Sequence, residues 1–387
     1  MPATSSVPEP EWFLVRTACC ADNSDQKAER IRGLLRGSIR WRLLLELADR
    51  HSVLPLFTQA LFSFPDSIPR GQTDLLKQSF QANLRKSLLL SRELIRIVDY
   101  LSTEGIDVMP YKGLALAEAV YGDIAMRQSG DIDLLVRAPD LLRIREAVRD
   151  LGYLPQVTFS DAEQRAYLKS GYECVFDGAA GRNLLEVQWA IQPRFYAVDF
   201  DMRGLFERAV TGAVAGYGVK TPCDEDLFIV LALHAAKHVW ARLIWLCDLD
   251  RIMRRPTLNW QMIASQAREL GIVRILRVTM LLANRLLDAP IPPAAETSVP
   301  PDLAASALAH EIERQVSSES TCAVESLAYF QLMLHLRERR VDQLRFLSRL
   351  AFTPGPGEWA AVRLPRPLFP LYRMVRLSRL AARFVRT

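Results

Sequence analysis

Hydrophobic residues recur at three- and four-residue steps over much of the first hundred positions. This spacing places apolar side chains on one face of an α-helix and predicts helices over residues 34–47 and 75–101. Proline and glycine in the segment 64–71 mark a break between these two helices. Residues 1–104 are therefore expected to form a helical N-terminal region.

A different pattern begins at residue 105, where short apolar runs alternate with segments of helical spacing. Two of these runs flank the turn-forming segment 177–183, which predicts a β-hairpin. Gly152 stands where a glycine commonly ends a helix. Residues 105–221 are thus expected to form a small α/β core with a mixed sheet. The expected elements are strands at 105–110, 131–136, 172–176 and 184–189 and helices at 113–121 and 141–151.

Helical spacing returns at residue 224 and continues nearly to the C-terminus. The expected fold class is therefore α+β, a small mixed-sheet core flanked by helical N-terminal and C-terminal regions, the latter covering residues 222–387. Helices are predicted at 226–240, 243–254, 260–270 and 275–287, followed by a proline-rich break at 289–301 and a pair of helices across 303–350.

Composition is that of a globular protein, since 50% of the residues are hydrophobic and 24% are charged. No apolar run approaches the roughly 20 residues that cross a bilayer, so integral membrane association is not expected. The N-terminus lacks the cationic start and apolar run of a secretory signal, which favours a cytoplasmic location. The six cysteines form no C-x-x-C pair and are expected to be reduced thiols.

The formal net charge of +5 is concentrated near the C-terminus. Seven arginines lie from Arg363 to Arg386 with no acidic residue among them, interleaved with Leu, Phe, Tyr and Met. Such a segment can meet an anionic partner, either a nucleic acid such as RNA or a membrane surface. The alternative, favoured by Pro365, Pro367 and Pro370, is an ordinary terminal helix whose apolar stripe docks on the body of the protein.

Two aspartates stand two residues apart on an apolar strand, in the run from Arg127 to Val136. Strand alternation points Asp131 and Asp133 to one face, with Cα atoms roughly 6–7 Å apart, where their charges repel unless a cation lies between them. Glu186 lies on the later strand with the same exposed-face pattern, and Gln188 shares its face. Carboxylate oxygens suit Mg²⁺, so these three acids are expected to hold two Mg²⁺ ions, with Mn²⁺ as the alternative. The other interpretation makes the acids ordinary polar residues paired with Arg127, Arg137 or Arg182.

Lys112 and Gly113 lie between a predicted strand and a predicted helix, upstream of the aspartates. Free backbone N–H groups and the positive end of the helix dipole at that position favour a triphosphate. Farther along, His234, Lys237 and His238 share one helical face. That face either lines the cleft, with Lys237 or His238 touching a phosphate, or forms a buried polar cluster bonded to Asp248 or to the backbone.

The runs from Tyr111 to Tyr121 and from Arg127 to Val136 resemble the poorly characterised bacterial nucleotidyltransferases of the DNA polymerase β-like superfamily. The run from Pro222 to Asp250 is similar to the helical signature that follows the core in one subgroup. This resemblance implies a nucleotidyltransferase core with Gly113 at the phosphates and Asp131, Asp133 and Glu186 as metal-binding catalytic acids. Leu114, where Ser or Gly is usual, and Gln188, where His is common, depart from the pattern.

The resulting expectation is a Mg²⁺-dependent transferase that moves a nucleoside monophosphate from a nucleoside triphosphate, such as ATP, to an acceptor hydroxyl and releases pyrophosphate. A small molecule or a peptide is favoured as the acceptor. One alternative is a catalytically impaired nucleotide-binding module, and another is an RNA-interacting protein that uses the C-terminal arginines. The residues expected to bind the nucleotide are Lys112, Gly113, Arg127, Lys237 and His238.

Overall fold

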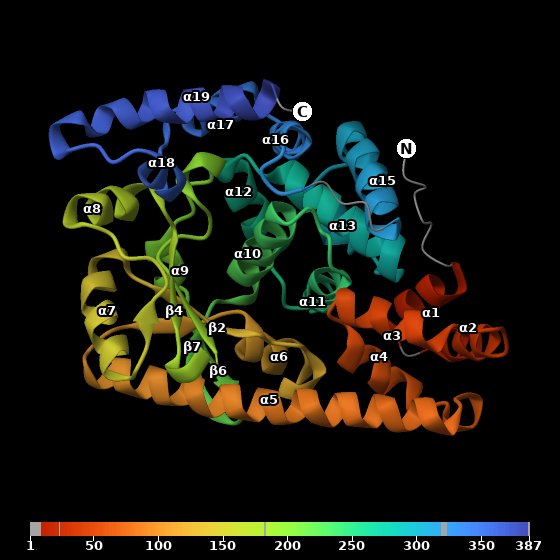
Figure 1. The fold of residues 1–387 in the computed structure, drawn as a ribbon. Coiled ribbons are helices and arrows are strands. Elements are labelled where there is room, and N and C mark those ends of the chain that lie inside the picture. Colours follow the sequence, from red (N-terminus) through yellow and green to blue (C-terminus); the bar gives the residue numbers. More distant parts are fainter. Residues whose placement is uncertain (1–8, 23, 182, 319–322, 386–387) are drawn as a thin grey trace.

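The computed structural model describes residues 9–22, 24–181, 183–318 and 323–385. Its elements follow the order helical, α/β, helical, so the α+β fold class with helical flanks is confirmed (Figure 1). Within the described residues five helices precede the first strand, and the last of them, α5, is 34 residues long and lies along the edge of the molecule beneath the sheet (Figure 1). These helices are α1 (Glu9–Cys19), α2 (Asp25–Leu35), α3 (Trp41–Arg50), α4 (Leu54–Leu61) and α5 (Arg70–Thr103), with a short 3-10 turn η1 (Pro65–Ser67).

The prediction of one helix over 34–47 is wrong. α2 ends at Leu35 and α3 begins at Trp41, so the chain turns in between. Gly37 and Ser38 occupy this turn, and the Gly37 N–H donates to the Leu34 carbonyl at 3.0 Å. Both residues are poor helix formers, which outweighs the continuous apolar spacing around them.

The larger sheet has five strands in the described part of the chain, in the order β1-β2-β5-β4-β3. β2 runs parallel to β5, whereas the β1–β2, β4–β5 and β3–β4 pairs are antiparallel. The sheet is therefore mixed, and the predicted hairpin is confirmed as β4 and β5. The elements of this part are β1 (Val108–Pro110), α6 (Gly113–Tyr121), η2 (Ile124–Met126), β2 (Asp131–Val136), η3 (Ala138–Asp140), α7 (Leu141–Asp150), β3 (Leu154–Pro155), α8 (Asp161–Ser170), β4 (Glu173–Asp177), η4 (Ala179–Gly181), β5 (Leu184–Gln188), η5 (Arg194–Tyr196), α9 (Met202–Glu207), β6 (Val210–Val214) and β7 (Tyr217–Thr221).

Strand alternation gives the sheet two different faces. Ile132, Leu134, Leu185 and Val187 point to one face and form a hydrophobic cluster with residues of α5 and α7. The residues between them, among them the acids of β2 and β5, point to the opposite face. Burial of the apolar face on α5 and α7 fixes the register of the strands, because a slip by one residue would exchange the two faces.

A second, two-stranded hairpin of β6 and β7 was not predicted from the sequence. Its turn contains Ala215 and Gly216, both with positive φ, as in a tight two-residue hairpin connection. The carboxylate of Glu118 on α6 accepts hydrogen bonds from the N–H groups of both turn residues. The hairpin is thereby fixed against the helix that begins at Gly113.

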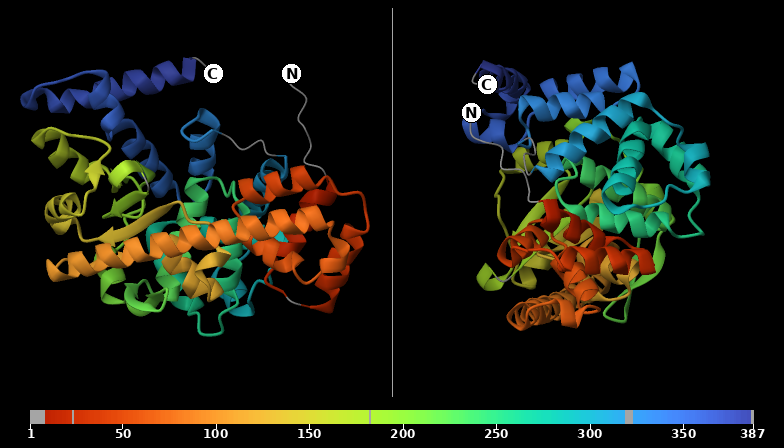
Figure 2. Two further views of the ribbon diagram at one scale, coloured as in Figure 1. Left: turned by 60° about the horizontal axis from the view of Figure 1, so that its bottom comes forward. Right: turned by 90° about the vertical axis from the view of Figure 1, so that its right-hand side faces the viewer.

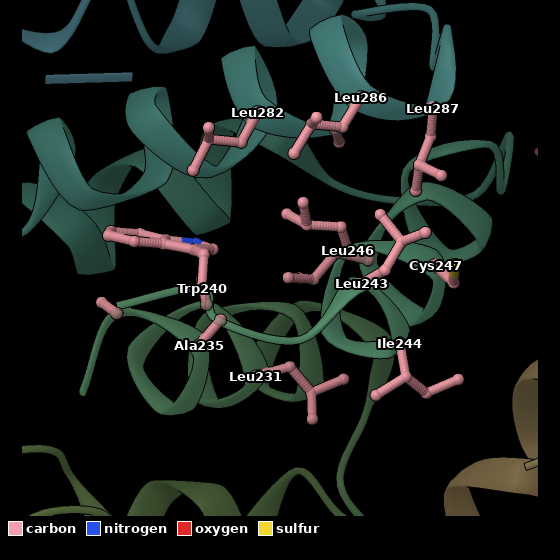
Figure 3. Close-up of a cluster of buried hydrophobic side chains, with 14 of the residues drawn as sticks. Leu231, Ala235, Trp240, Leu243, Ile244, Leu246, Cys247, Leu282, Leu286 and Leu287 are labelled. Atoms are coloured by element: carbon pink, nitrogen blue, oxygen red, sulfur yellow. The ribbon is translucent and has the colours of Figure 1, made fainter. Parts of the chain in front are cut away.

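The C-terminal helices begin with α10 and α11, which pack with α13 around a buried apolar cluster (Figure 3). Trp240 lies in this cluster, and its indole N–H donates to the Thr279 hydroxyl at 3.1 Å. The expected pair of helices across 303–350 is wrong, since three helices occupy this range in the described residues. The elements are α10 (Asp224–Lys237), α11 (Leu243–Met253), α12 (Trp260–Leu270), α13 (Val273–Leu287), α14 (Pro293–Ser298), α15 (Leu303–Ser317), α16 (Leu327–His335), α17 (Arg340–Phe352), α18 (Pro356–Ala361), η6 (Arg366–Leu371) and α19 (Tyr372–Val385).

None of the helices within the described ranges has the length and apolar character that a bilayer crossing requires. Among the described cysteines, Cys19, Cys20, Cys174, Cys223 and Cys247 are free thiols.

Candidate functional site

The start of α6 lies beside the strand that carries the aspartates. Gly113 is its first residue and has φ +54°, a conformation that side-chain-bearing residues rarely adopt. A Cβ atom on Gly113 would lie 3.6 Å from both the Asp131 carbonyl oxygen and the Ser129 hydroxyl. This spacing is an ordinary van der Waals contact, so it is the positive φ that favours glycine where the first turn of α6, with its free N–H groups, meets the start of β2.

The three predicted acids lie on the same face of two neighbouring strands. Asp133 on β2 is directly opposite Glu186 on β5, and Asp131 is two residues before Asp133. All three line one cavity of about 570 Å³, together with Lys112. The structure thus brings together residues that are more than fifty positions apart in the chain.

A lysine and a glutamine hold two of these acids. The Lys112 ammonium lies 2.7 Å from a carboxylate oxygen of Asp133. The Gln188 amide nitrogen donates to the same oxygen at 3.3 Å and to Glu186 at 3.0 Å, while its amide oxygen accepts a hydrogen bond from the buried Tyr111 hydroxyl. Because Tyr111 fixes the direction of the amide, Gln188 presents its NH₂ group to both acids.

The acids are crowded enough to disturb their ionisation. Burial, reinforced by the charge of Asp133, raises the pKa of Glu186 to about 8. Burial, again with the charge of Asp133, also raises the pKa of Asp131. Burial by itself would lower the pKa of Lys112, but the charge of Asp133 raises it instead. One ammonium thus compensates a group of three carboxyls, and the group favours additional positive charge.

The opposite side of the cavity is formed by the end of α10 and the start of α11. His234, Lys237 and His238 line it together with Trp245, which agrees with one of the two interpretations of this helical face. The two imidazole rings and the Trp245 indole contact each other with centroids 4.8–5.3 Å apart. Val239 and Trp240 both have positive φ in the turn between the helices, a rare conformation for such residues that brings Trp245 back over the histidines.

The titratable groups of this wall are shifted by burial. Burial and the charge of Lys237 lower the pKa of His238 to about 3, and burial together with the charge of Lys112 lowers that of His234. Both imidazoles are therefore neutral near pH 7 and can donate or accept a hydrogen bond without adding charge. Lys237 and Arg242 are cations of this wall, and the Lys237 ammonium donates to the Tyr172 hydroxyl at 3.1 Å. Asp248 does not contact the two histidines in any hydrogen bond of the described residues.

Arg127 lines the cavity, but its guanidinium is paired with Asp248. Its Nε atom donates to both oxygens of the fully buried Asp248, at 3.1 and 3.3 Å. The Tyr121 hydroxyl donates to the same carboxylate at 2.7 Å. Within the described residues Arg127 forms no ion pair with Asp131 or Asp133, and Arg137 pairs with Asp107. The alternative interpretation, in which arginines neutralise the acids, fails for these two; Arg182 lies outside the described residues.

Ser129 is a candidate that the sequence alone did not single out. Its hydroxyl lies in the cavity lining, is buried, and has no hydrogen-bond partner among the described residues. A buried hydroxyl without a partner is costly unless a ligand or water satisfies it. The sequence shows Ser129 two positions before Asp131, but serines are common in loops. Its role could not be predicted without the structure, which places it next to Gly113.

The three acids offer the kind of ligand atoms that a divalent ion requires. Asp131, Asp133 and Glu186 offer only carboxylate oxygens, which suits Mg²⁺, and the raised pKa values of Asp131 and Glu186 indicate that the group favours added positive charge. Within the described ranges, no three His, Cys, Asp or Glu side chains already stand close enough together to hold a metal ion. The residues fit Mg²⁺ in chemistry, while Asp133 is engaged with Lys112 and Gln188.

Comparison with known proteins gives one match. A family model described as "uncharacterised nucleotidyltransferase" matches residues 37–288, which is more than half of the chain. The matched range contains both strands that carry the acids, the start of α6 and the wall of α10 and α11. No curated protein and no solved structure matches the chain.

Proposed function

Because this chain belongs to the family of uncharacterised nucleotidyltransferases, we propose that the cavity between β2, β5 and α10 transfers a nucleoside monophosphate from a nucleoside triphosphate to an acceptor hydroxyl. The proposed chemistry is that of the DNA polymerase β-like superfamily. The observation that carries the proposal is the register of the acids. Asp133 lies opposite Glu186, and Asp131 lines the same cavity.

In the proposed reaction the acceptor oxygen forms a bond to the α-phosphorus. The bond from that phosphorus to the bridging oxygen breaks, and pyrophosphate leaves with the bonding electrons. The hydroxyl proton passes to solvent or to Glu186, which lies beside Asp133 in the cavity. Two Mg²⁺ ions, or Mn²⁺, held by Asp131, Asp133 and Glu186 would supply the positive charge that stabilises the attacking and leaving oxygens.

The remaining residues bind the nucleotide in this proposal. The free N–H groups of the first turn of α6 and the Ser129 hydroxyl would donate hydrogen bonds to the triphosphate, with Lys112 supplying charge beside them. Lys237 and His238 approach from the opposite wall, Lys237 as a cation and His238 as a neutral hydrogen-bonding group. Arg127 lies at the back of the cavity, where it is fixed by Asp248.

A second candidate function is a nucleotide-binding module without turnover. The ion pair between Lys112 and Asp133 favours it, because an oxygen needed as a metal ligand is already bound by an ammonium. Pyrophosphate release separates the two candidates, since a module of this kind would bind nucleotide and Mg²⁺ and release none.

The direct test incubates the protein with each nucleoside triphosphate labelled at the α-phosphorus, Mg²⁺ and a cell extract, and asks which molecule acquires the label. A labelled small molecule or peptide identifies the acceptor. The Asp133→Asn variant is expected to lower the rate of label transfer on the order of a hundredfold or more, because it removes charge that positions the reacting groups.

Asp177→Asn is the matched control, since Asp177 is an exposed acid at the end of β4, and it should keep full transfer. Equal transfer by Asp133→Asn and wild type would refute the assignment of the acids.

A further inference from the structure

The C-terminal helix α19 docks on the protein through a polar face. Tyr372 is buried, and the inward-facing Arg376 and Arg379 both form ion pairs with the buried Glu358, at 3.4 and 3.0 Å. The Arg376 Nε atom also donates to the Leu350 carbonyl on α17 at 2.6 Å. A surface helix usually packs on the protein through apolar residues such as leucine, whereas α19 does so through arginines and a tyrosine.

The apolar residues of α19 point the other way. Met374 is 66% exposed and Leu377 is 41% exposed, and they lie on the side of the helix opposite Tyr372 and Arg379. Leu371, one turn earlier, is also exposed. The expectation that the apolar stripe of this segment docks on the body of the protein is therefore wrong for these residues. The apolar face is presented to the outside.

The neighbouring helix α17 extends this apolar surface. It packs against α19, and Figures 1 and 2 place both helices at the edge of the molecule. Nine of the 21 exposed large hydrophobic residues in the described part of the chain lie between positions 341 and 377. Exposed apolar side chains gathered on neighbouring helices are typical of interaction sites. We call the exposed residues Val341, Leu344, Leu347, Leu368, Leu371, Met374 and Leu377 the C-terminal face.

This face lies in a strongly basic region. Residues 339–387 contain eleven arginines, two acidic residues and no lysine, a formal charge of +9, whereas the whole chain has +5. Residues 1–338 therefore carry −4. The sum of +9 already includes both acids of the basic region, Asp342 and Glu358, which are buried and paired with arginines. The exposed arginines Arg363 and Arg373 flank the apolar residues.

We propose that the C-terminal face binds the surface of an anionic lipid bilayer, with α19 lying in the plane of the interface. Apolar residues that enter the boundary of the acyl chains, flanked by arginines that meet lipid phosphates, are what such a surface requires. RNA would satisfy the arginines but would leave Met374 and Leu377 without an apolar partner. A second copy of the chain would bring two regions of +9 together, which electrostatic repulsion opposes.

The test is flotation of the full chain with vesicles of phosphatidylcholine, with and without phosphatidylglycerol. Binding is expected only to the anionic vesicles and should weaken with added salt. The double variant Met374→Glu, Leu377→Glu is expected to lose roughly tenfold or more of the affinity, because acids replace the inserted side chains. Arg373→Gln should lose about fivefold, the effect of one arginine near an anionic surface.

Leu303→Glu is the matched control, because Leu303 is 91% exposed on α15, outside the C-terminal face, and should leave binding unchanged. Circular dichroism and nucleotide binding of each variant show that it is folded. If the chain does not float with anionic vesicles, the proposal is overturned. A dimer in light scattering that Met374→Glu dissociates would also overturn it. Binding to single-stranded RNA that Arg373→Gln weakens and the double variant retains would do the same.

Discussion

Glu186 ties the chemistry of the site to the stability of the fold. Its pKa is raised to about 8 from an ordinary value of 4.5, so the folded chain retains a proton that the unfolded chain has lost. Stability from this group is therefore fully present below about pH 4.5 and declines as the pH rises through 8. In metal-free buffer, Glu186→Gln should show a shallower decline than wild type over this range, with melting temperatures differing by a few degrees above pH 8.

Thermal melts below and above pH 8, followed by circular dichroism with a chelator present, measure this difference. Glu146→Gln on α7 provides the control, since it makes the same chemical change at an exposed position outside the site. Parallel pH profiles for wild type and Glu186→Gln would contradict the raised pKa.

The sequence was sufficient to predict the three acids of the site, but it was not sufficient to predict which residues contact them. Asp131, Asp133 and Glu186 stand on recognisable strands, and period-two alternation indicates which way each side chain points. The engagement of Asp133 by Lys112, the fixed amide of Gln188 and the orphaned hydroxyl of Ser129 depend on distances between different elements. No spacing along one chain encodes such distances.

Among the elements, α6 has a start and an end that can be compared directly. Gly113 and Gly122 both have positive φ, +54° and +70°, and each would strain a Cβ-bearing residue by roughly 1 kcal/mol. Gly113→Ala and Gly122→Ala should therefore lower stability by similar amounts. Only Gly113→Ala is expected to weaken nucleotide binding, several-fold, because its methyl group would lie 3.6 Å from the Ser129 hydroxyl at the proposed phosphate site.

Calorimetry with a nucleoside triphosphate and Mg²⁺, beside denaturant unfolding, measures both effects. Equal nucleotide affinity in the two variants would remove the start of α6 from the site.

Element prediction succeeded where one local signal dominates. The helices at 113–121 and 260–270 and the strand at 131–136 have the predicted bounds, because each combines clear periodicity with a glycine or polar boundary. The hairpin of β6 and β7 was missed because Val210–Val214 and Tyr217–Thr221 alternate weakly and have exposed residues on both faces. It is fixed by Glu118 of α6, a contact that the local sequence does not reveal.

At the scale of the whole molecule, Asp248 connects the α/β core to the C-terminal helices. It lies on α11, is fully buried, and binds Arg127 before β2 and Tyr121 at the end of α6. Asp248→Asn would leave the buried Arg127 guanidinium without a counter-charge, at a cost of roughly 3–5 kcal/mol. The melting temperature should fall by roughly ten degrees.

Asp199→Asn is the comparison, because it breaks an exposed ion pair with Arg349 and should cost at most about 1 kcal/mol. Differential scanning calorimetry measures both variants. A melting temperature of Asp248→Asn within a degree or two of the comparison variant would show that the core and the helices are not coupled through this carboxylate.

The division at residues 104 and 221 remains a prediction, and α5 bears on it. Leu76, near its start, belongs to the hydrophobic cluster shared by the N-terminal and C-terminal helices, whereas Leu90, Leu94 and Ile97 belong to the cluster beneath the sheet. At 1.5 Å per residue, the helix spans roughly 50 Å and enters both clusters.

Because α5 enters both hydrophobic clusters, it limits which gene segments can be exchanged between proteins. A gene fragment that encodes only the sheet would produce strands whose apolar face is exposed to solvent, because α5, which covers that face, is encoded upstream of it. A transfer of the α/β core to another protein would leave this face uncovered unless α5 moved with it, and α5 also packs with the N-terminal helices. The length of α5 thus makes the transferable unit of evolution larger than the part that performs the chemistry.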